Sequence, residues 1–348
     1  MRAYVLHGVN DLRFEEVEEP NLQDNRVLLK VKAAGICGSD IPRIYTNGTY
    51  HFPTIPGHEF SGKVVRVGKE VDSKWLGKRV GLFPLIPCKE CGPCRKKQYE
   101  MCKSYSYLGS REDGGYAEYV TVPSENLVEL PETVSYEAAA MMEPMAVAVH
   151  AMRRMEVGQE ETVVICGLGT IGLLLLMFLR ETGVSNILVI GNKDFQKETI
   201  LNLGISEDCY CDSRKQDVEQ WILEQTSGNG TDVFFECVGK NETVIQAINS
   251  TIPGGKVMLL GNPHSDMDFE QNIYWKILRN QLTLKGTWNS SYTNEVKDDW
   301  HYVLDKVAKE KVNPEALITH KLKFDELEKG LKIMRDKTED YVKVMIVR

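Results

Sequence analysis

The spacing of hydrophobic residues divides the chain into two parts. Up to about residue 150, short hydrophobic runs such as 27–31, 62–67 and 116–122 are separated by Gly and Pro. Short alternating strands with frequent turns are typical of a largely antiparallel, barrel-like domain. From about residue 153, compact apolar strands alternate with helical patterns, which predicts a doubly wound parallel sheet. Its expected strands lie at 161–166, 186–190, 232–237, 256–260 and 282–285.

These patterns predict an α/β protein of two domains. We expect a first domain over residues 1–152, with a small separate lobe at 84–105, and a second domain over 153–287. After residue 287 the sequence offers one strong helix near 297–311 and a closing strand at 343–347. Residues 288–348 are too few for a third domain, so we expect them to return to the first one.

Charge and composition exclude several classes of protein. The 348 residues carry 42 Lys+Arg against 50 Asp+Glu, a net charge of -8, without a dense basic tract. Nucleic acids and membranes are therefore not expected as partners. The longest apolar run, 171–179, is too short to span a bilayer, and the first residues do not form a signal peptide. We expect a cytoplasmic protein, whose nine cysteines need a role other than disulfides.

Four of the cysteines have the spacing of a zinc site. They are Cys88, Cys91, Cys94 and Cys102, with two-residue gaps between the first three. Such gaps let one tight loop turn several thiolates toward one point, and four thiolates complete a closed tetrahedral site. Because a closed site leaves no open position, this zinc is expected to hold the lobe together rather than to take part in chemistry.

A glycine-rich turn marks a dinucleotide site in the second domain. Gly167, Gly169 and Gly172 follow the expected strand at 161–166 and open an apolar helix, with Thr170 and Ile171 between them. In this strand–turn–helix context the first glycine makes the turn, the second admits the pyrophosphate and the third lets the helix approach the strand. The free N–H groups of the helix start would then bind the phosphates.

The end of the next strand bears on which nicotinamide cofactor is used. A carboxylate about 20 residues after the glycines would bind the ribose 2′-hydroxyl of NAD. At that place the chain has Gly191, Asn192 and Lys193, and Asp194 comes only later. A missing acid with cations nearby favours a 2′-phosphate, and hence NADP. The alternative is that Asp194 reaches back and NAD is preferred.

A third set of residues lies in the first domain. Cys37 stands in a Gly-Ile-Cys-Gly-Ser-Asp segment, His58 and Glu59 in Gly-His-Glu-Phe-Ser-Gly, and Glu143 in Met-Glu-Pro. Cysteine, histidine and carboxylate are suitable zinc ligands, and three of them leave a position for a substrate. With the cysteine lobe and the glycine turn in the same order, the chain resembles the zinc-dependent medium-chain dehydrogenase/reductase family over nearly its whole length.

The resemblance implies the fold and the zinc chemistry. It implies a GroES-like catalytic domain, a Rossmann domain and two zinc ions per chain. The catalytic zinc would be bound by Cys37 and His58 and by a third ligand, Glu143, as in the polyol branch of the family. Glu59 would lie beside the zinc and either bind it directly or exchange with water or substrate. Ser39 would relay the hydroxyl proton toward solvent.

The resemblance also implies a substrate. The segments 38–48, 83–88, 109–115 and 276–279 are similar to those of hexitol-phosphate dehydrogenases of this family, which implies oxidation of galactitol 1-phosphate to tagatose 6-phosphate. Arg43 and Arg111 lie in these segments and would bind the phosphate. The alternative is an unphosphorylated polyol or secondary alcohol, such as sorbitol, xylitol or butanediol.

Other functions and the assembly state also follow from the resemblance. A binding protein with an inactive site and a zinc-free quinone reductase are further alternatives, which the set of zinc ligands disfavours. Relatives form homodimers or homotetramers, and the run 256–260 is a candidate for a sheet edge that joins two copies.

Overall fold

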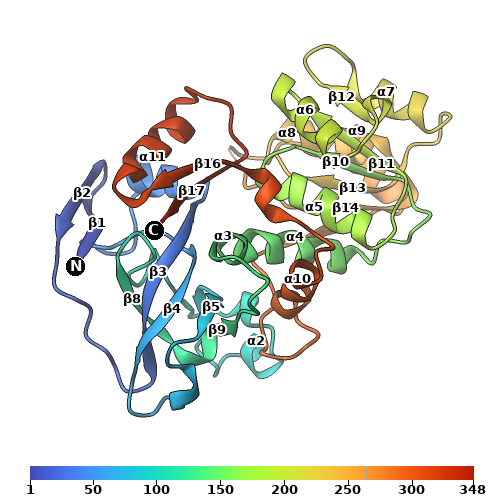
Figure 1. Ribbon diagram of the computed structural model, residues 1–348. Helices are drawn as coiled ribbons and strands as arrows, with labels where there is room; N and C mark the ends of the chain where they lie inside the picture. The colour runs from blue at the N-terminus through green and yellow to red at the C-terminus, as the bar shows by residue number, and fades with distance from the viewer. Residues whose placement is uncertain (264) are drawn as a thin grey trace. The chain divides into compact units, whose positions relative to one another are not determined.

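The computed structural model describes residues 1–263 and 265–348, which form two compact units (Figure 1). One unit comprises Met1–Ala146 and Ser290–Arg348, and the other comprises Val147–Asn289. The C-terminal segment therefore belongs to the same unit as the N-terminal half. The expected α/β architecture, with a largely antiparallel sheet in one unit and a parallel sheet in the other, is confirmed.

A seven-stranded sheet forms the centre of the first unit. The strand order is β16-β17-β3-β4-β5-β9, and β8 pairs with β3 beside β17. Strand β3 is eleven residues long, so β8 pairs with its start and β17 with its end. All pairs are antiparallel except β16 with β17. The strands are β3 (Arg26–Ile36), β4 (Glu59–Val67), β5 (Arg79–Leu82), β8 (Tyr119–Pro123), β9 (Leu127–Glu129), β16 (Ile318–Lys323) and β17 (Lys343–Val347).

Smaller elements complete this unit. Strands β1 (Arg2–Gly8) and β2 (Asp11–Glu16) form a hairpin, and β6 (Leu85–Ile86) pairs with β7 (Ser106–Tyr107) at the base of the cysteine lobe. Buried side chains of β1, β3, β4, β17 and helix α11 share one apolar core. The helices are α1 (Asp40–Pro42), α2 (Gly92–Arg95), α3 (Tyr136–Ala140), α10 (Asp299–Ala308) and α11 (Leu327–Asp336).

Helix α11 shows why the C-terminal segment returns to this core. Leu327, Leu331 and Met334 recur at helical spacing and are all buried, so they form one apolar face. Gly330 lies on the same helix at a point of close approach, because a Cβ there would come 2.7 Å from Ile36 Cδ1. The helix thereby covers β3 and β17 at the end of the chain.

Six parallel strands form the sheet of the second unit, in the order β12-β11-β10-β13-β14-β15. This order confirms the predicted doubly wound sheet. Residues 256–259 of the run 256–260 lie in β14, which is paired on both sides, so the expectation that the run forms an edge is wrong; the edge strands of this sheet are β12 and β15. The strands are β10 (Val163–Cys166), β11 (Ile187–Gly191), β12 (Tyr210–Asp212), β13 (Thr231–Glu236), β14 (Thr251–Leu259) and β15 (Thr283–Gly286).

Helices connect these parallel strands. The leucines of α5 are all buried, and α7 and α8 contribute to a cluster with the apolar side chains of β10, β11 and β13. Among the described residues, no helix is both long and apolar enough to cross a membrane. The helices are α4 (Met142–Met155), which crosses the boundary between the units, α5 (Thr170–Glu181), α6 (Asp194–Asn202), α7 (Val218–Gln225), α8 (Asn241–Ser250) and α9 (Gln271–Arg279).

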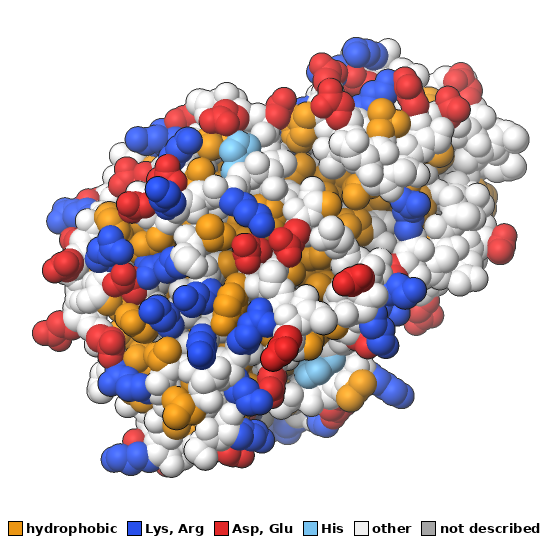
Figure 2. Space-filling model, in the orientation of Figure 1, with side chains coloured by type: hydrophobic (Ala, Val, Ile, Leu, Met, Phe, Trp, Pro, Cys, Tyr) orange, Lys and Arg blue, Asp and Glu red, His pale blue; other side chains and the backbone are white. Residues whose placement is uncertain are grey.

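The charged side chains of the surface are mixed in sign. On the face shown in Figure 2, Lys and Arg side chains are intermingled with Asp and Glu side chains. This mixture agrees with the small excess of acidic residues in the sequence.

Candidate active site and metal centres

The end of β3 and the start of β4 bring three metal-binding side chains together. Cys37 follows the last residue of β3, and His58 directly precedes Glu59, the first residue of β4. The two strands pair with Gly35 opposite Glu59, so these positions are neighbours in the sheet. One ligand atom from each of Cys37, His58 and Glu59 lies within 4.8 Å of the others. The three side chains therefore form one candidate metal centre.

Asp40 connects this centre to the surrounding backbone. It is fully buried, and it accepts hydrogen bonds from Cys37 N (3.0 Å) and Tyr116 Oη (2.7 Å). Arg43 Nη1 lies 2.5 Å from Asp40 Oδ1. Burial would raise the pKa of Asp40, but the facing His58 and Arg43 hold it well below the ordinary value. Asp40 is therefore a charged group that fixes the turn carrying Cys37.

His58 has an unsatisfied nitrogen in this environment. Its Nδ1 is buried and lies 3.5 Å from Asp40 Oδ1, but it makes no hydrogen bond within the described residues. Burial by itself would lower the pKa of His58. The neighbouring Asp40 and Cys37 outweigh burial and raise the pKa well above its ordinary value. The negative groups around this buried imidazole therefore favour a positive charge at this place.

Glu143 lies beside the three ligands. It is the second residue of α4, it is buried, and its Oε1 accepts a hydrogen bond from Tyr107 Oη at 3.1 Å. It does not belong to the group of ligand atoms within 4.8 Å of one another. Burial and the nearby Glu59 raise the pKa of Glu143, although His58 opposes them. Burial also raises the pKa of Tyr107 well above its ordinary value. The phenol therefore stays protonated and donates a hydrogen bond to Glu143.

Ser39 faces the metal centre from the turn after Cys37. Its Oγ donates a hydrogen bond to Cys37 Sγ at 3.3 Å. It also precedes the short helix α1, without capping that helix through its side chain. The hydroxyl is therefore directed toward the sulfur rather than toward the helix backbone.

The donor groups of the centre match a divalent cation. Four acidic side chains meet there, namely Cys37, Asp40, Glu59 and Glu143. Arg43 and Lys343 contribute two positive charges, and Lys343 makes an ion pair with Glu59. Buried charges need compensation, and the orphaned His58 nitrogen together with the mixed sulfur, nitrogen and oxygen donors fits a zinc ion.

The second candidate metal centre is the four-cysteine lobe. Sulfur atoms of Cys88 and Cys94 lie 4.0 Å apart, as do those of Cys91 and Cys102, and all four fall within 4.8 Å of one another. Four thiolates at about 2.3 Å from a zinc ion would be spaced about 3.8 Å apart. All four are free thiols rather than disulfides. Backbone N–H groups lower the pKa of Cys91 to about 6, whereas burial raises the pKa of Cys94 to about 12.

Contacts with the C-terminal segment hold this lobe in the first unit. Lys97 of the lobe makes an ion pair with Glu295, and next to the lobe Tyr292 Oη lies 3.0 Å from the backbone oxygens of both Glu125 and Leu127, which share its one hydroxyl proton. The lobe is remote in sequence from Cys37 and His58, and the two groups of ligands share no residue. The structure therefore separates them into two distinct centres.

The glycine turn of the second unit has the geometry that its sequence predicts. Gly167 follows β10 with φ +102°, and a Cβ on Gly172 would come 1.9 Å from Gly167 O. Only glycine fits these two positions. Around Gly169, the residue before α5, a Cβ would meet nothing within 4 Å. Thr170 and Ile171 form the first turn of α5, so open space lies beside a helix start.

A cavity of about 340 Å³ begins at this turn. Its lining includes Gly167, Gly169, Asn192, Ser213 and Lys240. The open helix start supplies N–H groups for phosphates, and the glycines let a ligand approach the backbone. The residues present therefore fit a dinucleotide.

Gln196 closes the end of β11. Its Oε1 accepts a hydrogen bond from Asn192 N at 2.9 Å, and its Nε2 donates to Leu168 O at 3.1 Å. A Cβ on Gly191 would come 2.8 Å from Gln196 Oε1 and 2.9 Å from Tyr210 Oη. Position 191 therefore has no room for the carboxylate that would bind a ribose hydroxyl there.

The charged residues near this strand end are engaged with one another. Asp194, which the NAD alternative requires, pairs with Arg214 at 2.5 Å. Arg214 also pairs with Asp212, at 2.6 Å. Lys197 pairs with Glu207, and Lys193 precedes α6. Asp194 is thus held by an arginine that sequence reasoning did not consider.

Sequence reasoning missed several residues of these sites. Asp40 could have been found from its place three residues after Cys37. Tyr107, Lys343 and Arg214 have no such local signal, because each reaches its site through tertiary pairing. The predicted phosphate ligands are also placed differently: Arg43 lies in the metal centre, whereas Arg111 stacks on Tyr50 and Tyr105.

Comparison with known families follows the division into units. Residues 23–132 match the model of the alcohol dehydrogenase GroES-like domain, and residues 170–309 match the model of the zinc-binding dehydrogenase. These matches cover more than half of the chain. The chain therefore belongs to the zinc-binding, medium-chain alcohol dehydrogenase family.

Individual relatives are dehydrogenases of different sugar-derived substrates. The chain is 31% identical over 322 residues to galactitol 1-phosphate 5-dehydrogenase of Escherichia coli K12, covering 91% of this chain and 92% of the relative. It is 33% identical over 333 residues to L-idonate 5-dehydrogenase of Vitis vinifera, covering 94% and 88%. The chain is about equally identical to enzymes that act on different substrates. These relatives therefore show the branch of the family but do not identify the substrate of this chain.

Solved structures of the family have the same fold. The crystal structure of galactitol-1-phosphate dehydrogenase from Escherichia coli matches with a TM-score of 0.91 and 30% identity, and each chain is covered completely. A zinc-binding dehydrogenase from Sinorhizobium meliloti 1021 bound to NADP matches with a TM-score of 0.90, 27% identity and coverage of 100% and 99%. A dehydrogenase from Escherichia coli CFT073 complexed with NADH matches with a TM-score of 0.91, 26% identity and the same coverage.

Proposed function

We propose that this protein is a zinc-dependent dehydrogenase that oxidises a secondary hydroxyl of a hexitol phosphate to a ketone. The specific reaction is galactitol 1-phosphate to tagatose 6-phosphate, with reduction of a nicotinamide cofactor. The observation that carries the proposal is the meeting of one ligand atom each from Cys37, His58 and Glu59 within 4.8 Å, with His58 and Glu59 buried.

Zinc held by Cys37, His58 and a carboxylate would act as a Lewis acid that lowers the pKa of the substrate hydroxyl. Asp40 fixes the turn that carries Cys37, and the Tyr107 hydroxyl orients Glu143. A bound nicotinamide would supply the acceptor for the hydride of the substrate carbon, that is, for one proton with two electrons, and the hydroxyl proton would pass separately to solvent.

Two carboxylates are available as the third protein ligand. Glu59 is within reach of Cys37 and His58, but it also makes an ion pair with Lys343. Glu143 keeps one oxygen on Tyr107. We assign both to the centre, one as a ligand and the other as a group that replaces it when water or substrate binds.

Ser39 is assigned to the proton path. Its hydroxyl lies against Cys37 Sγ, at the edge of the centre. A hydroxyl can accept one proton while it donates another. Ser39 would therefore take the substrate proton and pass it on without a change in its own charge.

NADP is the proposed cofactor. Gly191 has no space for an acidic side chain, and Asp194 is held by Arg214. The backbone of Gly167, Gly169, Thr170, Ile171 and Gly172 would bind the pyrophosphate, and Asn192 and Lys193 would lie near the adenosine ribose.

The second candidate function is oxidation of an unphosphorylated polyol. It is supported by the similar identity of the chain to L-idonate 5-dehydrogenase and to sorbitol dehydrogenase of Arabidopsis thaliana (32% over 335 residues). Zinc chemistry would be the same for both classes of substrate, so only the groups that bind the far end of the substrate distinguish them. Assembly into homodimers or homotetramers stays a prediction.

A substrate panel tests this function. Purified full-length protein is assayed with galactitol 1-phosphate, galactitol, sorbitol, xylitol and butanediol, each with NAD and with NADP. The highest kcat/KM is expected for galactitol 1-phosphate with NADP. Higher kcat/KM for a free polyol would support the second candidate, and no oxidation of any member would contradict both.

A further inference from the structure

Arg111 lies between two tyrosines in the first unit. Its guanidinium carbon is 4.0 Å from the ring centre of Tyr50 and 4.6 Å from that of Tyr105. Arginine stacks on aromatic faces in this way while its N–H groups stay in the plane. Its backbone oxygen lies 3.1 Å from His51 Nε2. The guanidinium is therefore held in a defined orientation with only its edge left for hydrogen bonds.

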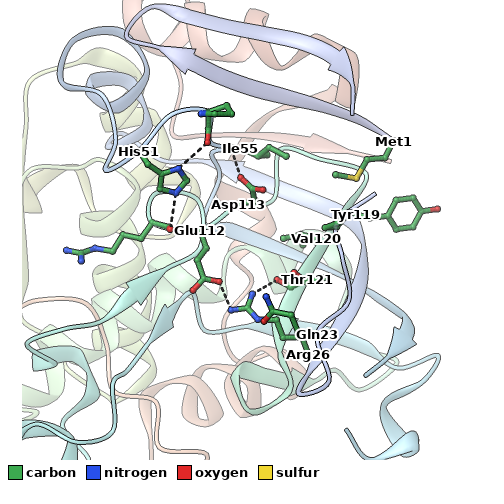
Figure 3. Close-up of a pocket in the computed structure, with 13 residues that line it drawn as sticks. Met1, Gln23, Arg26, His51, Ile55, Glu112, Asp113, Tyr119, Val120 and Thr121 are labelled. Carbon is green, nitrogen blue, oxygen red and sulfur yellow. Dashed lines mark hydrogen bonds and ion pairs between the residues drawn. The ribbon is translucent and has the colours of Figure 1, made fainter. Parts of the chain in front are cut away.

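The donors of this guanidinium have no acceptor. Within the described residues, no oxygen lies in hydrogen-bond geometry with a side-chain nitrogen of Arg111, and its Nε is buried without a partner. The two adjacent acids are engaged elsewhere, as Figure 3 shows: Glu112 pairs with Arg26 at 2.5 Å, and Asp113 Oδ1 accepts a hydrogen bond from Ile55 N at 2.9 Å. The Arg111 guanidinium is therefore not neutralised by an acid of this chain within the described residues, and its Nε remains a buried donor without an acceptor.

Arg43, the other predicted phosphate ligand, is in the opposite situation. It pairs with the fully buried Asp40 at 2.5 Å, and its side chain is only 17% exposed. Burial lowers the pKa of Arg43, but Asp40 and Cys37 outweigh burial and raise it. Arg43 is thus already engaged in an ion pair at the metal centre, and it is poorly placed to bind a phosphate as well.

Aromatic side chains connect Arg111 to the metal centre. Tyr105 packs edge-on against Tyr107, with ring centres 6.2 Å apart, and the Tyr107 hydroxyl donates a hydrogen bond to Glu143. Tyr107 also lies 5.7 Å from the ring centre of His58. The unpaired guanidinium is therefore separated from the proposed ligands by two rings, all in one unit.

We propose that Arg111, oriented by Tyr50 and Tyr105, is the subsite for the phosphate of a phosphorylated polyol, and that Arg43 is not part of it. The inference rests on the proposed function and names the end of the substrate that this site binds. A phosphate monoester presents oxygens in the plane of the guanidinium edge, where two parallel hydrogen bonds form. Tyr50, one of the two rings that flank the guanidinium, is 67% exposed, so this side of the subsite lies at the surface.

The test compares matched substrates on matched variants. Galactitol 1-phosphate and galactitol differ only in the phosphate, and Arg111→Gln removes the charge while keeping a polar side chain. Arg111→Lys keeps the charge without the planar edge. Arg26→Gln is the control, since Arg26 pairs with the neighbouring Glu112 and belongs to neither centre. Calorimetric binding of galactitol 1-phosphate and competitive inhibition by inorganic phosphate are measured beside turnover.

Arg111→Gln is expected to raise KM for galactitol 1-phosphate by about 10- to 100-fold, since hydrogen bonds between charged groups contribute that much. Its kcat/KM for galactitol should change less than about threefold, and Arg111→Lys should be intermediate. Inorganic phosphate should inhibit wild type and Arg26→Gln, and Arg111→Gln much less.

Three results would overturn the subsite: equal loss for both substrates, an unchanged preference for the phosphate ester, or a wild-type preference for galactitol. A wild-type preference for galactitol would overturn the phosphate subsite but would not contradict the proposal that the protein is a dehydrogenase. If no polyol is oxidised, the proposed function fails, and calorimetry still decides the subsite by whether galactitol 1-phosphate binds wild type more tightly than Arg111→Gln.

Discussion

Lys343, in the last strand of the chain, forms a buried ion pair with Glu59 beside the proposed metal ligands. Both side chains are 2% exposed, and Lys343 Nζ also donates a hydrogen bond to Ile36 O at 3.1 Å. Gly35 makes room for the pair, because a Cβ there would come 2.7 Å from Lys343 Cε. The C-terminal strand thus compensates a charge at the centre of the N-terminal domain.

Removing one partner of this ion pair should lower the free energy of unfolding more than removing both partners does. Lys343→Met leaves Glu59 buried without compensation, and we expect a loss of about 3–5 kcal/mol in the free energy of unfolding. The double variant Lys343→Met/Glu59→Gln should recover part of that loss. Urea unfolding in zinc-saturated buffer measures both, and strictly additive losses would show that the two side chains do not depend on each other.

The four-cysteine lobe should contribute stability but no chemistry. Cys94→Ser replaces one of four thiolates of a closed site, so we expect loss of one zinc per chain and faster proteolysis within residues 84–105. Cys211→Ser is a matched control, because Cys211 is buried in the second unit and belongs to no metal centre. Unchanged zinc content in Cys94→Ser would contradict the assignment.

An acid at position 191 should not produce an NAD-specific enzyme. In Gly191→Asp the new side chain meets Gln196 and Tyr210, so we expect destabilisation of about 1–3 kcal/mol from overpacking. In Asn192→Asp the acid avoids that contact, and the ratio of kcat/KM for NAD to that for NADP should rise. A stable Gly191→Asp variant with inverted cofactor preference would show that the space at this strand end was misjudged.

The His301–Asp298 pair predicts a pH-dependent stability. His301 Nδ1 lies 2.8 Å from Asp298 Oδ1, and this hydrogen bond raises the pKa of His301 above 6.5. A raised folded-state pKa means that the stabilisation is complete below pH 6.5 and is lost as the pH rises through the folded-state value. The difference in unfolding free energy between wild type and His301→Gln should therefore be larger at pH 5.5 than at pH 9. A difference that grows with pH would rule out this origin.

Local spacing in the sequence was sufficient for some features. The cysteine lobe and the glycine turn each lie within one short segment, so their geometry follows from a few neighbouring residues. Cys37 and His58 are 21 positions apart in sequence, and the resemblance to a family brought them together before the pairing of β3 with β4 could be known.

Other features depend on tertiary pairing and had no local signal. Lys343 is distant in sequence from Glu59, and nothing in its own segment marks it as a partner. The short strand β12 (Tyr210–Asp212) escaped the pattern of apolar runs, and with it Arg214, which holds Asp194. The order of β14 and β15 at the sheet edge was likewise misread, because apolar strands look alike whether one or two neighbours pair with them.

The most direct test of the central claim is the zinc content of wild type and of Cys37→Ser, measured by elemental analysis together with turnover and thermal unfolding. We predict two zinc ions per chain in wild type. Cys37→Ser should keep one zinc and still unfold in a single cooperative transition but lose turnover. A wild-type protein with a single zinc, or a Cys37→Ser variant that keeps two zinc ions and full turnover, would contradict a catalytic zinc at Cys37 and His58.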